Sequence, residues 1–165
     1  MRKTDIIIGL FILAILAGII FWVRRPKENL QVPEDTTSNV EEQMESFFNI
    51  EIPEDAEKAQ LKDVTGGNAS GIATRDQENG TFVHVVLADL PDPEEGFFYE
   101  GWLVRGKTGD ENFDFISTGK MTMAKGGYLL EFESQDDLSE YTGVVITLEE
   151  VEDANPEKHI LEGSF

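Results

Sequence analysis

The residues of this 165-residue chain that could do chemistry are almost all carboxylates. Aspartate and glutamate number 33 against 13 lysines and arginines, which gives a net charge of −20 at pH 7. A body this acidic repels phosphates and anionic headgroups, so we expect no nucleic-acid binding. Solubility alone, life in high salt or a cationic partner would each favour such acidity. The acids that we single out as candidate interaction residues, all in turn-rich stretches, are Asp92, Glu94, Glu95, Asp110, Glu111, Asp136 and Asp137.

Metal and catalytic chemistry have little support in the motifs. Calcium prefers oxygen ligands, and the acidic stretches 110–114 (DENFD) and 149–153 (EEVED) are where it would bind, although neither has EF-hand spacing. His84 and His159 are far apart, and G-x-S-x-G, HExxH and glycine-rich phosphate-binding motifs do not occur. The chain has no cysteine, which excludes disulfides and zinc–thiolate sites. We therefore expect no enzyme, no cofactor and no metal site; a hydrolase that joins a histidine to a carboxylate and a hydroxyl is the alternative.

An apolar segment near the amino terminus predicts a membrane anchor. Residues 6–23, IIIGLFILAILAGIIFWV, carry no charge over 18 positions. As a helix this segment is roughly 27 Å long, close to the ~30 Å hydrocarbon core of a bilayer. A cleaved signal peptide is the alternative, but its apolar core would be shorter and followed by a small-residue cleavage site, whereas FWVRR follows here. We predict a transmembrane helix over residues 6–23.

The orientation of this anchor is less strongly encoded, because basic residues flank the span on both sides and the positive-inside rule is nearly balanced. Only residues 1–5 precede the span, and such a short tail is typical of a cytoplasmic amino terminus. We therefore expect a single-pass protein of the cell membrane whose carboxy-terminal domain is extracytoplasmic.

Residues 24–60 have the composition of an acidic, flexible linker, rich in Pro, Thr, Ser and Asn. One stretch within it, EEQMESFF (41–48), favours a short helical turn with Met44, Phe47 and Phe48 on one side. Such a turn would be a transient helix, would tuck against the domain that follows, or would dock a partner.

From residue 61 to residue 165, short apolar runs alternate with Gly- and Pro-containing turns, which predicts strands. No segment of helical periodicity and useful length appears there. This pattern predicts an all-β domain, an antiparallel β-sandwich with an Ig-like arrangement. The expected strands are 61–64, 69–76, 81–90, 97–106, 113–123, 128–134, 142–150 and 158–165.

Alternation within these runs predicts which side chains are buried. Both faces of 81–90 are apolar, so this strand should be central, whereas 128–134 should have one wet face. In YEGWLV (99–104), Tyr99 and Leu103 should share one face and Trp102 the other, and we expect Trp102 to be a core residue. Gly101 between them predicts a β-bulge or a close approach of another ring.

The order of these features resembles a known family. A glycine-led strand (SGIAT), a hydrophobic strand ending in Leu-Pro, the Tyr-x-x-Trp-Leu-Val run, a Ser-Thr-Gly step and a late VVITLEE strand follow one another over residues 61–165. This arrangement is similar to the carboxy-terminal extracytoplasmic domain of the anti-sigma-K factor (RskA-like) family. The family pattern is matched by Tyr99, Trp102, Leu103, Gly119, Thr147 and Glu149. The resemblance implies a fold and no catalytic set; Gly101 and residues 152–156 depart from the pattern.

The resemblance also implies a function. Members of that family carry a cytoplasmic sigma-binding domain before the membrane span, and residues 1–5 are too few to form one. We therefore expect a membrane-anchored extracytoplasmic sensor or interaction module that regulates sigma-factor signalling through an envelope protein partner. The alternative is a structural or ligand-binding envelope β-sandwich, with a cation or a glycan as the ligand.

Overall fold

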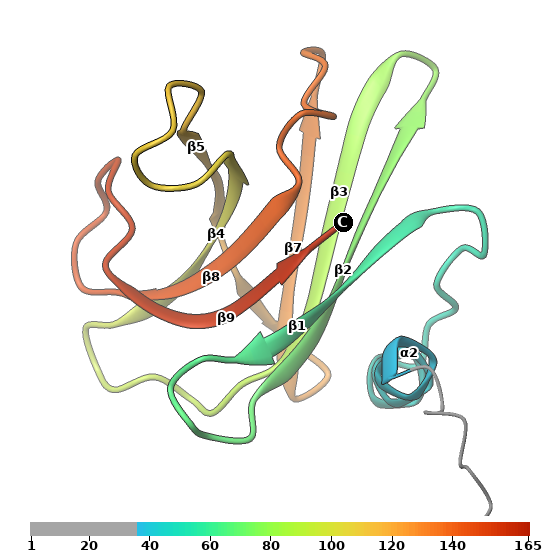
Figure 1. Cartoon of the computed structure of the whole chain (residues 1–165). Helices are drawn as coiled ribbons and strands as arrows, with labels where there is room; N and C mark the ends of the chain where they lie inside the picture. The colour runs from blue at the N-terminus through green and yellow to red at the C-terminus, as the bar shows by residue number, and fades with distance from the viewer. Residues whose placement is uncertain (1–35) are drawn as a thin grey trace, which may run out of the picture. The chain divides into compact units, whose positions relative to one another are not determined.

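The computed structural model describes residues 36–165, which form one helix and nine strands (Figure 1). The predicted transmembrane helix 6–23 and the tail 1–5 lie outside the described residues. From residue 36 onwards, no helix is long and apolar enough to cross a membrane. The elements in chain order are α2 (Thr36–Phe48), β1 (Glu57–Asp63), β2 (Ser70–Glu78), β3 (Thr81–Asp89), β4 (Phe98–Arg105), β5 (Asp114–Lys120), β6 (Thr122–Ala124), β7 (Gly127–Ser134), β8 (Gly143–Glu149) and β9 (Lys158–Ser164).

The nine strands form a single antiparallel sheet in the order β5-β4-β8-β9-β1-β2-β3-β7-β6. The all-β, antiparallel class is therefore confirmed, but the Ig-like arrangement of two separate sheets is wrong. Strand β1 is the reason, because it pairs with β2 through six residue pairs and with β9 through Lys62 and Asp63. This double pairing joins what would otherwise be two sheets into one.

The sheet curls until it is nearly closed. Its two edge strands, β5 and β6, are consecutive in the chain and separated only by Met121, so the predicted single strand 113–123 is in fact two. The curled sheet encloses a core of aliphatic and aromatic side chains, among which Leu61, Leu103, Ile146 and Leu161 are fully buried. Burying each such side chain stabilises the fold by roughly 1.5–3 kcal/mol, so this interior is the main source of stability.

Two predictions about individual strands are confirmed. Strand β3 lies between β2 and β7 and is buried over most of its length, as expected of a central strand. Strand β7 turns Leu130 into the core and leaves Glu131 and Glu133 exposed on the other face. The period-two alternation was therefore sufficient to assign the inner and outer faces of both strands.

Helix α2 covers part of the outer face of the sheet. Val40, Met44 and Phe48 recur at intervals of four, which places them on one side of the helix, where they pack with Ile72 of β2 and Leu87 of β3. Met44 is fully buried, whereas Phe47, expected on the same side, is 39% exposed. The range expected to be a linker, 24–60, thus contains a packed helix and the start of β1 from residue 36 on.

Candidate interaction site on the outer face of β4 and β8

Strand β4 carries three of the residues on which the family resemblance depends. Tyr99 and Leu103 point into the core, as does the bare backbone of Gly101. A Cβ atom at Gly101 would lie 2.6 Å from both Leu130 Cδ1 and Thr118 Oγ1, so the interior has room for glycine only. The register between β4 and β5 shifts between Gly101 and Trp102, which confirms the predicted bulge.

The bulge has a counterpart on β5, where Gly119 faces Gly101 with a φ of +102°. A β-branched or bulky residue would be strained in this conformation, so Gly119 serves the backbone geometry of the bulge. Tyr99 lies near the start of β4, and its hydroxyl donates to the Pro91 carbonyl of the preceding loop at 2.9 Å.

Trp102 is buried, as predicted, but on the outer face of the sheet and not in the enclosed core. Its Nε1 donates to Thr147 Oγ1 of the neighbouring strand at 2.8 Å, and that hydroxyl lies 3.4 Å from the Glu100 carbonyl oxygen. The ring packs edge-on to Phe115 with centroids 5.9 Å apart. Only 1% of Trp102 is exposed, so the outer face of β4 and β8 is covered here by neighbouring side chains and loops.

Two buried glutamates complete this cluster. Glu149 Oε1 accepts the Glu157 N–H at 2.9 Å, and Glu100 Oε1 accepts the Ser117 hydroxyl. The other oxygen of Glu100, Oε2, has no hydrogen-bond partner among the described residues. Burial raises the pKa of the Glu100 carboxyl, the Ser117 hydrogen bond opposes this, and the nearby charge of Glu149 raises the pKa further.

The loop between β8 and β9 lies over these glutamates. Besides the Glu149–Glu157 bond, the Glu150 N–H donates to Glu157 Oε2 at 2.7 Å. Lys120 of β5 pairs with Glu152 at 2.6 Å, and its ammonium lies 3.9 Å from the centre of the Phe98 ring. We call Glu100, Trp102, Thr147, Glu149 and the loop 150–157 the polar latch. Glu149 fastens the loop to the sheet, and the other three residues form hydrogen bonds on the same face.

A groove of about 440 Å³ opens beside the polar latch. Its floor is aromatic and apolar, with Trp102, Phe113, Phe115 and Val145, and Pro156 of the latch loop lines it as well. The ring centroids of Phe113 and Phe115 lie 5.8 Å apart, and Phe113 is 36% exposed. A concave apolar floor with a few polar groups is suited to binding a side chain or a ring of a partner molecule. The polar residues that also line it are Lys107, Thr108, His159 and Glu162.

The predicted interaction loops are divided between the two ends of the sheet. Asp110 and Glu111 follow β4, and Asp136 and Asp137 precede β8, so they share one end, where Arg105 pairs with Asp114 at 3.4 Å and with Glu140 at 3.1 Å. The loop between β3 and β4 lies at the opposite end, where Asp92 Oδ1 accepts the Tyr128 hydroxyl at 3.2 Å. The exposed acids of that loop, besides Asp92, are Glu94 and Glu95.

Several of these acids stabilise their own loops. Asp110 Oδ2 accepts the Lys107 N–H at 2.9 Å, and Asp137 Oδ1 accepts the Ser139 N–H at 3.0 Å, which lowers the pKa of Asp137 together with the Ser139 hydroxyl. Such bonds shape turns whether or not a partner binds. Glu111 and Asp136 are exposed as well, so both loops at this end present acidic side chains to solvent.

The structure does not bring the two histidines together. His84 of β3 is fully buried; its Nδ1 lies 2.8 Å from the Thr74 carbonyl oxygen, its ring packs edge-on to Phe165, and desolvation lowers its pKa to about 4. His159 of β9 is exposed and pairs with Glu162 at 2.6 Å. Across residues 36–165, no three His, Asp or Glu side chains converge as a metal site would require.

Some of the site could not be found from the sequence. Alternation along 97–106 is consistent with Glu100 on the face of Trp102, but nothing in the local pattern indicated that the loop 150–157 would bind Glu149 on the same face. Phe113 and Phe115 were assigned to a strand without a role, and their spacing of two was the one signal that they share a face. The groove lies where the turn after β4 meets residues of β8 and β9, so it depends on pairings between strands that are far apart in the sequence.

The fold and the site define an all-β domain whose outer face carries a hydrogen-bonded polar latch beside an aromatic groove. The model of the anti-sigma-K factor rskA C-terminal family matches residues 9–160, which is most of the chain. The chain therefore belongs to this family, and the resemblance in its strand motifs is confirmed. Comparisons with curated proteins and with solved structures gave no significant match.

Proposed function

We propose that this protein is a membrane-anchored extracytoplasmic interaction module that regulates sigma-factor signalling by binding a protein partner. Membership in the anti-sigma-K factor family carries this proposal, because that family is regulatory. The aromatic groove and the acidic loops at the same end of the sheet support protein binding. A partner would place an apolar side chain on the exposed ring of Phe113 and would meet the carboxylates of the loops at the rim.

The test is site-specific photocrosslinking in intact cells. A photoreactive residue is placed in turn at Glu94, Asp110 and Asp137, and the products are identified by mass spectrometry. We expect one specific protein from Asp110 and Asp137, which flank the groove end, and a weaker product from Glu94 at the opposite end. Only lipid, cell-wall material or no product at any of the three positions would contradict the proposal.

The aromatic floor also favours a second candidate, binding of a glycan, since sugar rings pack on exposed aromatic faces such as that of Phe113. Saturable binding of cell-wall oligosaccharide to the purified protein, lost in Phe113→Ala and kept in Phe97→Ala, would favour this candidate. Phe97 is a suitable control because it lies in the loop between β3 and β4, away from the groove.

Membrane topology is part of the proposal and can be tested separately. The chain contains no cysteine, so a single cysteine introduced at Glu111 is the only one available to a maleimide. If the domain is extracytoplasmic, a membrane-impermeant maleimide labels this position in intact cells. A cysteine at Thr4, expected in the cytoplasm, should react only after the cells are lysed; the opposite pattern would reverse the topology.

A further inference from the structure

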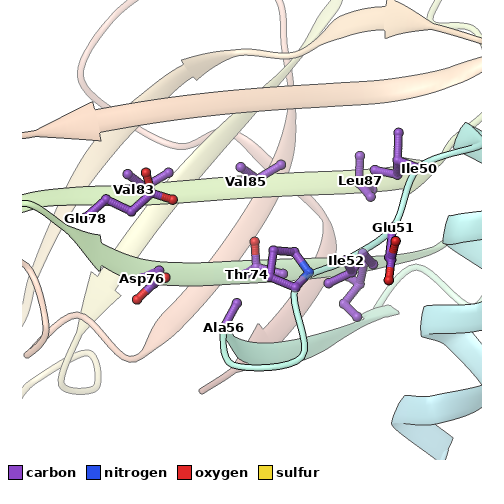
Figure 2. A pocket seen from close by; sticks show the side chains of 12 residues that line it. Ile50, Glu51, Ile52, Ala56, Thr74, Asp76, Glu78, Val83, Val85 and Leu87 are labelled. Atoms are coloured by element: carbon purple, nitrogen blue, oxygen red, sulfur yellow. The ribbon is translucent and has the colours of Figure 1, made fainter.

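A second surface of the domain is built differently from the groove beside Trp102. It lies on the outer face of β2, β3 and β7, where Val83 and Val85 of β3 point away from the core and are partly exposed. Figure 2 shows Val83, Val85 and Leu87 in a row along one strand, with Thr74 and Asp76 on the strand beside it. The hollow above them measures about 200 Å³ and is bounded at one side by residues 50–56.

Acidic side chains border this row on both sides. In the register of the sheet, Asp76 of β2 and Glu133 of β7 lie on either side of Val83, and Glu131 lies beside Val85. Paired residues of antiparallel strands point to the same face, so these carboxylates stand beside the valines. Glu78 adds a further carboxylate at the end of β2. We call Val83 and Val85, with Asp76, Glu78, Glu131 and Glu133, the acid-bordered strip.

The carboxylates of the strip have no counter-ion within the domain. All four acids are exposed, and none forms an ion pair with any residue in the range 36–165. A second copy of the chain would bring the same acids against them, and an anionic lipid surface would repel them too. The charge of the strip therefore favours a positively charged occupant over an anionic one.

Helix α2 shows how this face accepts a helix. It seats Met44 and Phe48 on Ile72 and Leu87, and Glu41 of α2 pairs with Lys58 of β1 at its border. Val85 packs against the edge of this seat, and the strip continues the same row of β3 side chains from there to Val83. Strands lie about 4.8 Å apart, so the borders on β2 and β7 are separated by about 10 Å, close to the width of one helix.

We propose that the acid-bordered strip binds a basic amphipathic helix of a protein partner, with aliphatic side chains on Val83 and Val85 and lysines or arginines on the two acidic borders. This inference rests on the proposed function, since it names the chemistry of the partner that a protein-binding module would engage. It adds a binding surface to the groove end and does not replace it.

The test uses the purified full-length protein in detergent and a labelled peptide of about 15 residues, made of leucine and lysine at helical spacing. A scrambled peptide of the same composition has no apolar face. We expect the ordered peptide to bind more tightly, and we expect its affinity to fall about tenfold in Glu131→Lys/Glu133→Lys. The matched control, Glu94→Lys/Glu95→Lys, changes the net charge equally at the far end of β3 and should change the affinity less than twofold.

A second variant tests the apolar part of the strip. Val83→Thr/Val85→Thr keeps the shape and the β propensity of both side chains, so the protein should fold, and the affinity should fall severalfold with an unchanged salt dependence. Equal losses in the two charge-reversal variants, or equal binding of the two peptides, would overturn the inference. Either result leaves the crosslinking test at Asp110 and Asp137 unaffected, so the proposed function can stand when the strip fails.

Discussion

Two regions of the same sheet face outward and are covered in different ways. On β4 and β8, the polar latch is held by the hydrogen bond from Trp102 to Thr147 and by a loop fastened through Glu149. On β2 and β3, helix α2 covers Ile72 and Leu87 by apolar packing and leaves Val83 and Val85 partly exposed.

The difference lies in what the carboxylates of each region do. In the latch, Glu100 and Glu149 are buried and hold neighbouring groups, so they belong to the stability of the fold. In the acid-bordered strip, Glu131 and Glu133 are exposed and hold nothing within the described domain. Acidic side chains are therefore structural in the latch and solvent-exposed in the strip, and single substitutions can separate the two cases.

The largest effect is expected from removing the centre of the latch. Trp102→Ala deletes a fully buried ring and leaves the Thr147 hydroxyl without its donor, so the free energy of unfolding should fall by about 4 kcal/mol. Chemical denaturation followed by circular dichroism measures this change. A loss under 1 kcal/mol would mean that the ring contributes to binding and not to the fold.

The second largest loss in the free energy of unfolding is expected where α2 packs on the sheet. Met44 is fully buried against the sheet, so Met44→Ala should cost about 3 kcal/mol, whereas Glu42→Ala on the exposed side of the helix should cost less than 0.5 kcal/mol. Hydrogen exchange of the amides of α2 would show whether the loss is local. If both variants unfold like the wild type, α2 does not contribute to the stability of the domain.

Glu100 should make the latch sensitive to pH. Burial raises its pKa above the ordinary value of 4.5, so the folded protein keeps this proton to higher pH than the unfolded chain does. The contribution of this group to the free energy of unfolding is therefore fully present below pH 4.5, and it is lost as the pH rises through the raised pKa. Glu100→Gln should gain thermal stability relative to the wild type between pH 4 and pH 7; a pH-independent difference would refute this.

The smallest effect on stability is expected at the acid-bordered strip. Glu133→Gln removes an exposed charge that forms no ion pair in the described domain, so the free energy of unfolding should change by less than 0.5 kcal/mol. The matched change in the latch, Glu149→Gln, alters a buried carboxylate that holds the loop and should cost more. Equal costs would remove the distinction between the two regions.

Local alternation predicted most of the strands, because apolar side chains at a spacing of two must share a face wherever that face is buried. The runs that became β3, β7 and β8 agree with the predicted ranges to within a residue or two. Pairing order was not encoded in the same way. Strand β1 pairs with its neighbour β2 and also with β9, and the second pairing joins segments about a hundred residues apart. Nothing in either of these two distant segments indicates it.

Helix α2 was underestimated for a physical reason. Its mean composition is acidic and polar, which is typical of a linker, and only Val40, Met44 and Phe48 carry its apolar side. These three residues stabilise the helix only by packing on Ile72 and Leu87, which lie on strands β2 and β3. Alternation correctly placed Trp102 on the face opposite Tyr99 and Leu103, but we expected a core residue, whereas its partners Thr147 and Phe115 bury it on the outer face.

The connection of β5 to β6 through Met121 has a consequence for behaviour at high concentration. Unpaired strand edges recruit further strands, from the same chain or another, and lead to aggregation. Here the two edge strands follow one another in the chain, and β6 spans only Thr122–Ala124. The β6 edge thus offers a template of only 3 residues to another chain, whereas the β5 edge offers 7. We therefore expect pairing between copies of this domain to be limited at β6 and to begin, if anywhere, at β5.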